Sequence, residues 1–127
     1  MRLYHRRVFG TLKIKFKQNW LIMARFICKF TDNGTDYYLE WSTIVDAPVT
    51  CGMSREEFTN FYREEYGRDA MRFEFPERMK RVDEKGTSAR VYDNVDEVLM
   101  GNKAGKNGER LSKGEIIEKY CRRNHAV

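Results

Sequence analysis

Residues 25–42 read RFICKFTDNGTDYYLEWS, two alternating stretches separated by the dipeptide Asn33-Gly34. Asn-Gly favours a two-residue type I′ turn, because both central positions of that turn need a positive φ. The turn also sets the register, since residues equally distant from it face each other. Counting outward gives three apolar pairs on one face, Phe30–Tyr37, Cys28–Leu39 and Phe26–Trp41. We therefore expect an antiparallel hairpin at the centre of the fold, with Cys28 as a small core residue and not a nucleophile.

The other face of this hairpin is mixed in character. Its pairs are Lys29–Tyr38, Ile27–Glu40 and Arg25–Ser42. Such a composition is typical of a sheet face exposed to solvent. Arg25, Lys29 and Tyr38 are also the residue types with which a sheet stacks a base and neutralises phosphate. The alternative prediction is therefore that this face binds nucleic acid instead of only facing solvent.

Two helices carry strong local signals. Ser54 and Glu57 form a capping box, aromatic residues then recur at helical spacing, and Gly67 is placed to end the helix. Ser112 and Glu115 form a second capping box, which predicts a final helix that buries apolar residues through Tyr120. An aromatic stripe at this spacing is typical of a core face.

Weaker patterns predict the remaining elements. We expect the second hairpin strand to continue through 43–45, a strand over 71–75 ended by Pro76, and a strand over 87–92. Asp93 is expected to cap a short helix that ends at Gly101. The fold class that follows is α+β, with a small antiparallel sheet built on the Asn33-Gly34 hairpin and packed against two or three short helices.

Length and charge limit the domain organisation. The chain has 127 residues, enough for one core, and a net charge of +5. Residues 1–22 hold six basic residues and no acidic one, which leaves 18 basic against 19 acidic residues, a net of −1, for residues 23–127. We expect residues 23–127 to form a single compact α+β domain. Residues 1–22 are either a dispensable basic extension or an edge strand through Leu12, Ile14 and Phe16.

Cysteine usage and hydropathy suggest the compartment. The three cysteines are odd in number and spaced far from a CxxC pattern, so neither a disulfide framework nor a zinc finger is supported. No apolar run approaches the roughly 20 residues that a membrane-spanning helix needs. We expect a cytoplasmic protein without a membrane partner, in the host cytosol if a phage encodes it.

The sequence offers little for catalysis. Only His5 and His125 are present, both close to a terminus, so a positioned imidazole is not expected. Four acidic residues and one lysine resemble the pattern of a metal-dependent nuclease, in which carboxylates hold Mg²⁺ and a lysine assists the attacking water. These residues are Asp69, Glu74, Glu77, Asp83 and Lys85. The same spacing occurs by chance in many charged proteins. Asp93 and Asp96 are explained by helix capping without a metal. We expect no enzyme activity, no metal and no cofactor.

The loop Gly101–Arg110 is the most suggestive segment. It contains three glycines and three cations and leads into the helix capped by Ser112, a combination suited to phosphate. It is not a P-loop, because its first glycine lies one residue too close to the second and Asn107 follows Lys106. The candidate phosphate or nucleotide ligands are Lys103, Gly105, Lys106, Gly108, Arg110 and Ser112. An ordinary surface loop rich in turn residues is the alternative.

Two functional hypotheses follow. The first is a small non-catalytic binding protein that acts stoichiometrically on a host protein; the second is a nucleotide- or nucleic-acid-binding module that uses the 101–110 loop. In size and composition the chain resembles the small cytosolic accessory proteins of phages and other mobile elements. That resemblance implies a protein that blocks or redirects a host system, including host defence, by direct binding. Self-association into a homo-oligomer is left open.

Overall fold

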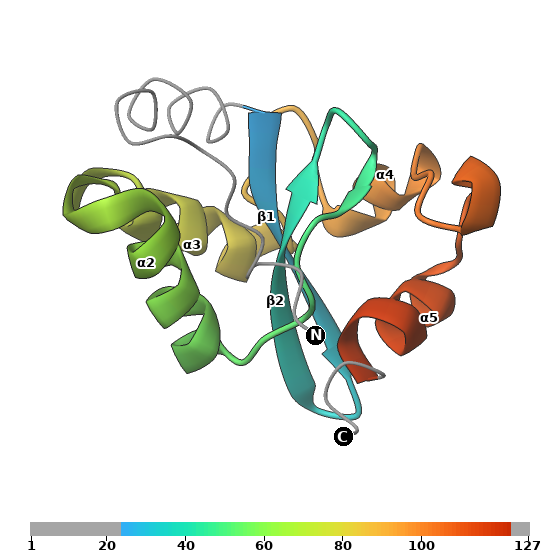
Figure 1. The fold of residues 1–127 in the computed structure, drawn as a ribbon, viewed down its shortest axis with the longest axis horizontal. Helices are drawn as coiled ribbons and strands as arrows, with labels where there is room; N and C mark the ends of the chain where they lie inside the picture. Colours follow the sequence, from blue (N-terminus) through green and yellow to red (C-terminus); the bar gives the residue numbers. More distant parts are fainter. Residues whose placement is uncertain (1–23, 123–127) are drawn as a thin grey trace.

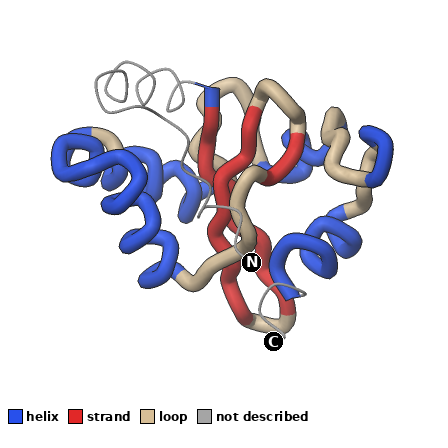
Figure 2. Tube along the Cα trace, viewed as in Figure 1, coloured by secondary structure: helices blue, strands red, loops and turns tan. Residues whose placement is uncertain are grey.

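The computed structural model describes residues 24–122, which form three layers with a β-hairpin in the middle. Helices α2 and α3 lie on one side of the hairpin, and α4 and α5 lie on the other (Figure 1). The strands are β1 (Arg25–Asp32), β2 (Thr35–Ser42) and β3 (Ala47–Pro48). The helices are α2 (Arg55–Phe73), α3 (Phe75–Lys85), α4 (Val95–Met100) and α5 (Lys113–Ile116), with a 3₁₀ turn η2 (Lys106–Gly108) and a π-helical segment η3 (Ile117–Arg122). The three strands precede all of these helices along the chain and form one antiparallel sheet, so the fold is α+β (Figure 2).

The predicted hairpin is confirmed, including its register. Asn33 and Gly34 both have positive φ, and every pair counted from the turn is found, from Asp32–Thr35 to Arg25–Ser42. The predicted continuation of the second strand through residue 45 is wrong. The strand ends at Ser42, because the chain turns there and returns as β3, with Ala47 opposite Ser42 and Pro48 opposite Trp41.

Both faces of the hairpin are buried, which corrects the prediction of a solvent face. The expected apolar face packs against α4, α5 and η3, and Cys28 lies in that core. The mixed face packs against α2 and α3, so that Ile27 and Glu40 are 0% exposed and Tyr38 is 4% exposed. The aromatic stripe of α2 covers Ile27 and Tyr38, and Glu40 acquires hydrogen-bonding partners in place of water.

Helix α2 begins as predicted and ends later than predicted. Ser54 and Glu57 form both bonds of the capping box. Gly67 leaves the helical region, with a φ of 87°, but the chain resumes a helical path to Phe73. The predicted strand over 71–75 is therefore wrong. Pro76 lies in the first turn of α3, where a helix does not need its missing N–H.

The predicted strand over 87–92 is reduced to one bridge. Thr87 pairs with Cys28, and along the outer edge of β1 the Ser88 N–H donates to the Ile27 carbonyl while the Ser88 hydroxyl accepts the Ile27 N–H. The chain then turns into α4, whose N-cap is Asn94 and not Asp93, since the Asn94 side chain accepts from the Glu97 N–H. Residues 86–88 thus protect one edge of the hairpin, and residues 47–53 protect the other.

The final helix begins at the predicted capping box, with both Ser112–Glu115 bonds present. Ile116, Ile117 and Cys121 are buried against the hairpin, and Tyr120 is partly buried. Over residues 24–122, no helix has the length and hydrophobicity that crossing a bilayer requires. The expectations for residues 1–22 and for His5 and His125 lie outside the described part of the chain.

Candidate functional site

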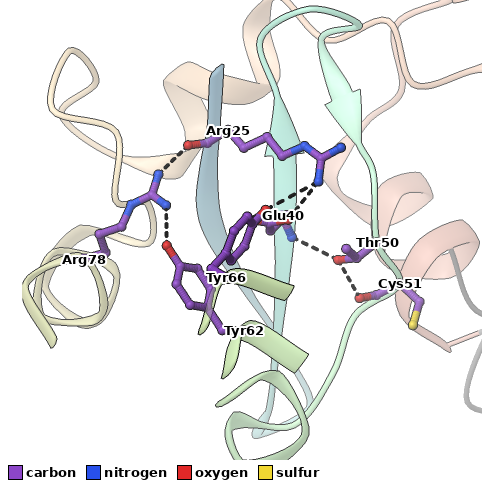
Figure 3. A network of polar contacts seen from close by, with 7 residues as sticks. All are labelled: Arg25, Glu40, Thr50, Cys51, Tyr62, Tyr66 and Arg78. Atoms are coloured by element: carbon purple, nitrogen blue, oxygen red, sulfur yellow. Dashed lines mark hydrogen bonds and ion pairs between the residues drawn. The ribbon is translucent and has the colours of Figure 1, made fainter. Parts of the chain in front are cut away.

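A buried carboxylate lies under α2, on the face that sequence patterns assign to solvent. Glu40 accepts hydrogen bonds from the Tyr66 hydroxyl, which lies 2.7 and 2.8 Å from its two carboxylate oxygens. The Arg25 guanidinium adds an ion pair at 3.3 Å (Figure 3). Thr50 accepts the backbone N–H of Glu40 at 3.0 Å and donates its hydroxyl to the Cys51 carbonyl. Every polar group around the carboxylate is therefore satisfied within the fold.

Arg78 extends this network to α3. Its guanidinium donates to the Tyr62 hydroxyl at 2.8 Å and to the backbone carbonyl of Arg25. Figure 3 shows Arg78 and Arg25 approaching from opposite sides, with Tyr62 and Tyr66 between them. The network thus joins the start of β1 to both helices on this face.

The electrostatics of the network reflect its burial. Loss of water raises the pKa of Glu40, although Arg25 and the Tyr66 hydrogen bond act in the opposite direction. Burial raises the pKa of Tyr62 to about 12 and raises that of Tyr66 as well. Glu40 is 0% exposed, so its carboxylate is shielded from any substrate in solution. These properties are those of a specific structural network.

The predicted sheet-face residues are all engaged within the fold. Arg25 binds Glu40, Lys29 lies 4.0 Å from Asp83, and the Tyr38 hydroxyl lies 3.3 Å from the same carboxylate. Arg55 donates to Asp83 at 3.0 Å, and this hydrogen bond is the main reason that the pKa of Asp83 lies below its usual value. The ring of Tyr38 packs against α2, so it offers no open face for a base to stack on.

The other acids of the nuclease-like pattern lie on helices and not on neighbouring strands. Asp69 is in α2, Glu74 joins α2 to α3, and Glu77 is in the first turn of α3. Lys85 donates to the Tyr92 carbonyl at 2.6 Å. Within residues 24–122, no set of three or more His, Cys, Asp or Glu side chains has the arrangement of a metal site.

The 101–110 loop is held in one conformation by a buried asparagine. The Asn102 side chain donates to the carbonyls of Leu99 and Leu111 and accepts from the N–H groups of Ala104 and Leu111. Gly105 is required by close packing, because a Cβ there would lie 2.8 Å from the Glu109 carbonyl. No sequence signal identifies Asn102 as the residue that organises this loop.

The cations of this loop are exposed, but the adjoining helix terminus is already occupied. Lys103, Lys106 and Arg110 are exposed, with Gly105 partly buried between them and Gly108 exposed in the η2 turn. The Ser112 hydroxyl accepts the Glu115 N–H, and the Glu115 carboxylate accepts the Ser112 N–H at 2.8 Å. A carboxylate therefore sits where a phosphate would bind at the start of α5.

A second exposed feature adjoins this loop, the β2–β3 turn of residues 43–46. The Lys103 N–H donates to the Asp46 carbonyl at 2.8 Å, which joins the turn to the loop. Thr43 donates its N–H and its hydroxyl to the Ala24 carbonyl, both at 2.9 Å. Ile44 and Val45, at the tip, are nevertheless 57% and 50% exposed. The sequence pattern predicts that these β-branched residues continue a strand, so no sequence signal marks them as an exposed surface.

We searched for similarity to known proteins. No protein-family model, no curated protein and no solved structure matches this chain.

Proposed function

We propose that this protein is a non-catalytic binding protein that docks on another protein through its β2–β3 turn and acts by occupying that partner. The observation that carries the proposal is the exposure of Ile44 and Val45 on a turn tied to the fold by hydrogen bonds of the Thr43, Ile44 and Asp46 backbones. Single exposed apolar side chains are common, but two adjacent ones on a hydrogen-bonded turn form a contact surface whose backbone is already ordered before binding.

The surroundings of the turn suggest what the partner presents. Lys103 is exposed directly beside Asp46, and Met100 in the preceding helix is 69% exposed. Apolar anchors beside a cation fit an apolar pocket with an acidic rim. Stoichiometric occupation of a host protein is also the mode of action implied by the resemblance to phage accessory proteins.

The test starts by capturing partners with the full chain and then measures each purified partner by calorimetry. Ile44→Asp with Val45→Asp should weaken a one-to-one complex by at least about tenfold, because a charge would enter the apolar contact. Phe73→Asp is the matched control, since Phe73 is 65% exposed at the end of α2, across the hairpin from the turn.

Equal loss of affinity in both variants would reject the turn as the docking site. Turnover of a substrate by the purified protein would reject the non-catalytic function itself.

A further inference from the structure

Four arginines from three segments gather where β1 begins. Arg25 opens β1, Arg78 and Arg81 lie one turn apart in α3, and Arg90 follows the segment that edges β1. Arg78 donates to the backbone carbonyl of Arg25, and Arg81 Nε donates to the Ser88 carbonyl at 2.8 Å. We call these four residues the arginine cluster.

The place of Arg90 follows from the pairing along β1. Thr87 bridges Cys28 in antiparallel register, and the Ser88 N–H donates to the Ile27 carbonyl at 2.9 Å. Arg90 lies two residues beyond Ser88, in the turn that follows this short pairing. The ring of Tyr92 lies 6.0 Å from that of Phe26, so the chain stays beside the start of β1 beyond Arg90.

Positive charge exceeds negative charge in the cluster. Glu40 is buried and compensates Arg25, and Glu77 acts on Arg81 only weakly. Among residues 24–122, no carboxylate forms an ion pair with Arg81 or Arg90. The pKa of Arg81 lies below its ordinary value because of burial and because Arg90 and Arg78 repel its charge. An anion placed between these side chains would remove that repulsion.

The orientation of Arg81 suits a phosphate. Its Nε is taken by Ser88, while its two terminal nitrogens have no hydrogen bond to a residue of the described fold. Through these two terminal nitrogens, a guanidinium can donate two parallel hydrogen bonds to a phosphate. Arg90 is exposed and can reach a neighbouring phosphate.

We propose that Arg81 and Arg90 bind phosphates of a nucleic-acid backbone, with Arg78 as fixed positive charge behind them. Positive charge concentrated around one corner of a domain is characteristic of binding to a long polyanion. The near-neutral total of residues 23–127 hides this local excess.

The full-length protein tests the proposal by fluorescence anisotropy with labelled single-stranded DNA, duplex DNA and RNA of one sequence. Arg81→Gln with Arg90→Gln should lower the affinity at least about tenfold at low salt. The same variant should flatten the log–log dependence of affinity on salt by about two, since each lost phosphate contact removes about one unit of slope. Arg90→Gln alone should give part of the effect, and it breaks no hydrogen bond of the described fold.

The matched control is Lys106→Gln with Arg110→Gln, which removes the same charge from the 101–110 loop. This control should leave the affinity nearly unchanged, and circular dichroism should show that each variant melts cooperatively. Loss of binding in the loop variant alone, or no binding of the wild type to any of the oligonucleotides, would overturn the proposal. Binding of polyglutamate but not of nucleic acid would overturn it in favour of an acidic protein ligand.

Discussion

Removal of the Tyr66 hydroxyl should destabilise the protein because of the charge on Glu40. Tyr66→Phe keeps the ring in place and deletes a donor 2.7 Å from a carboxylate that is 0% exposed. Hydrogen bonds to charged groups contribute about 1.5–3 kcal/mol, so the loss should fall in that range. Urea denaturation followed by the fluorescence of the buried Trp41 measures it.

The matched background for this experiment is Glu40→Gln. There the Tyr66 hydroxyl faces a neutral amide of the same shape, and deleting the hydroxyl should cost only about 1 kcal/mol. The difference between the two losses, about 0.5–2 kcal/mol, is the part due to the charge. Equal losses in the two backgrounds would refute the charge-based account.

The raised pKa of Glu40 determines how the stability and the cost of Tyr66→Phe should change with pH. The pKa of Glu40 is raised above its ordinary value of 4.5, so the folded state holds the proton more tightly than the unfolded state does. The contribution of Glu40 to stability is therefore largest below pH 4.5 and declines as the pH rises through the folded pKa. The cost of Tyr66→Phe should grow over the same interval, because the hydroxyl matters most to the ionised form. In the Glu40→Gln background the cost should not change with pH, and growth there would contradict the assignment to Glu40.

Three further predictions concern the packing of the chain. Gly86→Ala should lower the free energy of unfolding, measured by urea denaturation, by about 1–2 kcal/mol, because Gly86 has a φ of +86°. Gly101→Ala is the control and should change this free energy little, because Gly101 has a φ of −108° and open space around it. Gly52→Ala should cost about 1–3 kcal/mol, since its Cβ would lie 2.6 Å from Cys121 Sγ, and the cost should be smaller in a Cys121→Ala background; an equal cost there would rule out this clash. Burial raises the pKa of Cys121 to about 12 and the other two cysteines are buried as well, so a thiol reagent at neutral pH should label all three only after denaturation.

The parts of the fold that sequence predicts correctly are those set by neighbours in the chain. Asn33-Gly34 determines its own turn, and the register follows by counting. The capping boxes at Ser54 and Ser112 are likewise complete within four residues. In each case the residues that form the structure are neighbours in the chain, so packing against distant segments does not change the outcome.

The errors arise where distant packing decides. The face with Ile27 and Glu40 has the composition of a solvated face, yet α2 covers it, and Tyr66 supplies the donor that makes burial of the carboxylate tolerable. Alternation over 71–75 suggested a strand, but Phe73 is exposed and Phe75 is buried in a helix that Pro76 helps to begin. A pattern of five residues cannot distinguish these outcomes, because the deciding contacts are made by other segments.

The candidate surfaces show the same limit. Lys103, Lys106 and Arg110 are noticeable in the sequence because they lie within eight residues of one another, and the structure leaves each of them on an exposed loop. Arg81 and Arg90 are not adjacent, and they approach each other only because Ser88 is bonded to β1 and to α3 at once. Like charges brought together by tertiary contacts have no signature in a single sequence.

The two proposed surfaces lie on opposite sides of the start of β1. Thr43, in the β2–β3 turn, donates to the Ala24 carbonyl, and Arg78, in the arginine cluster, donates to the next carbonyl, that of Arg25. The Ile27 carbonyl accepts from Ser88 at the outer edge of β1, and alternate residues of a strand direct their carbonyls to the same edge, so the Arg25 carbonyl faces that edge too. The turn is therefore reached from the β2 side and the cluster from the outer edge of β1. A substitution on one surface should leave the other intact, and a partner that engages both has to reach around the point where residues 1–22 join the fold.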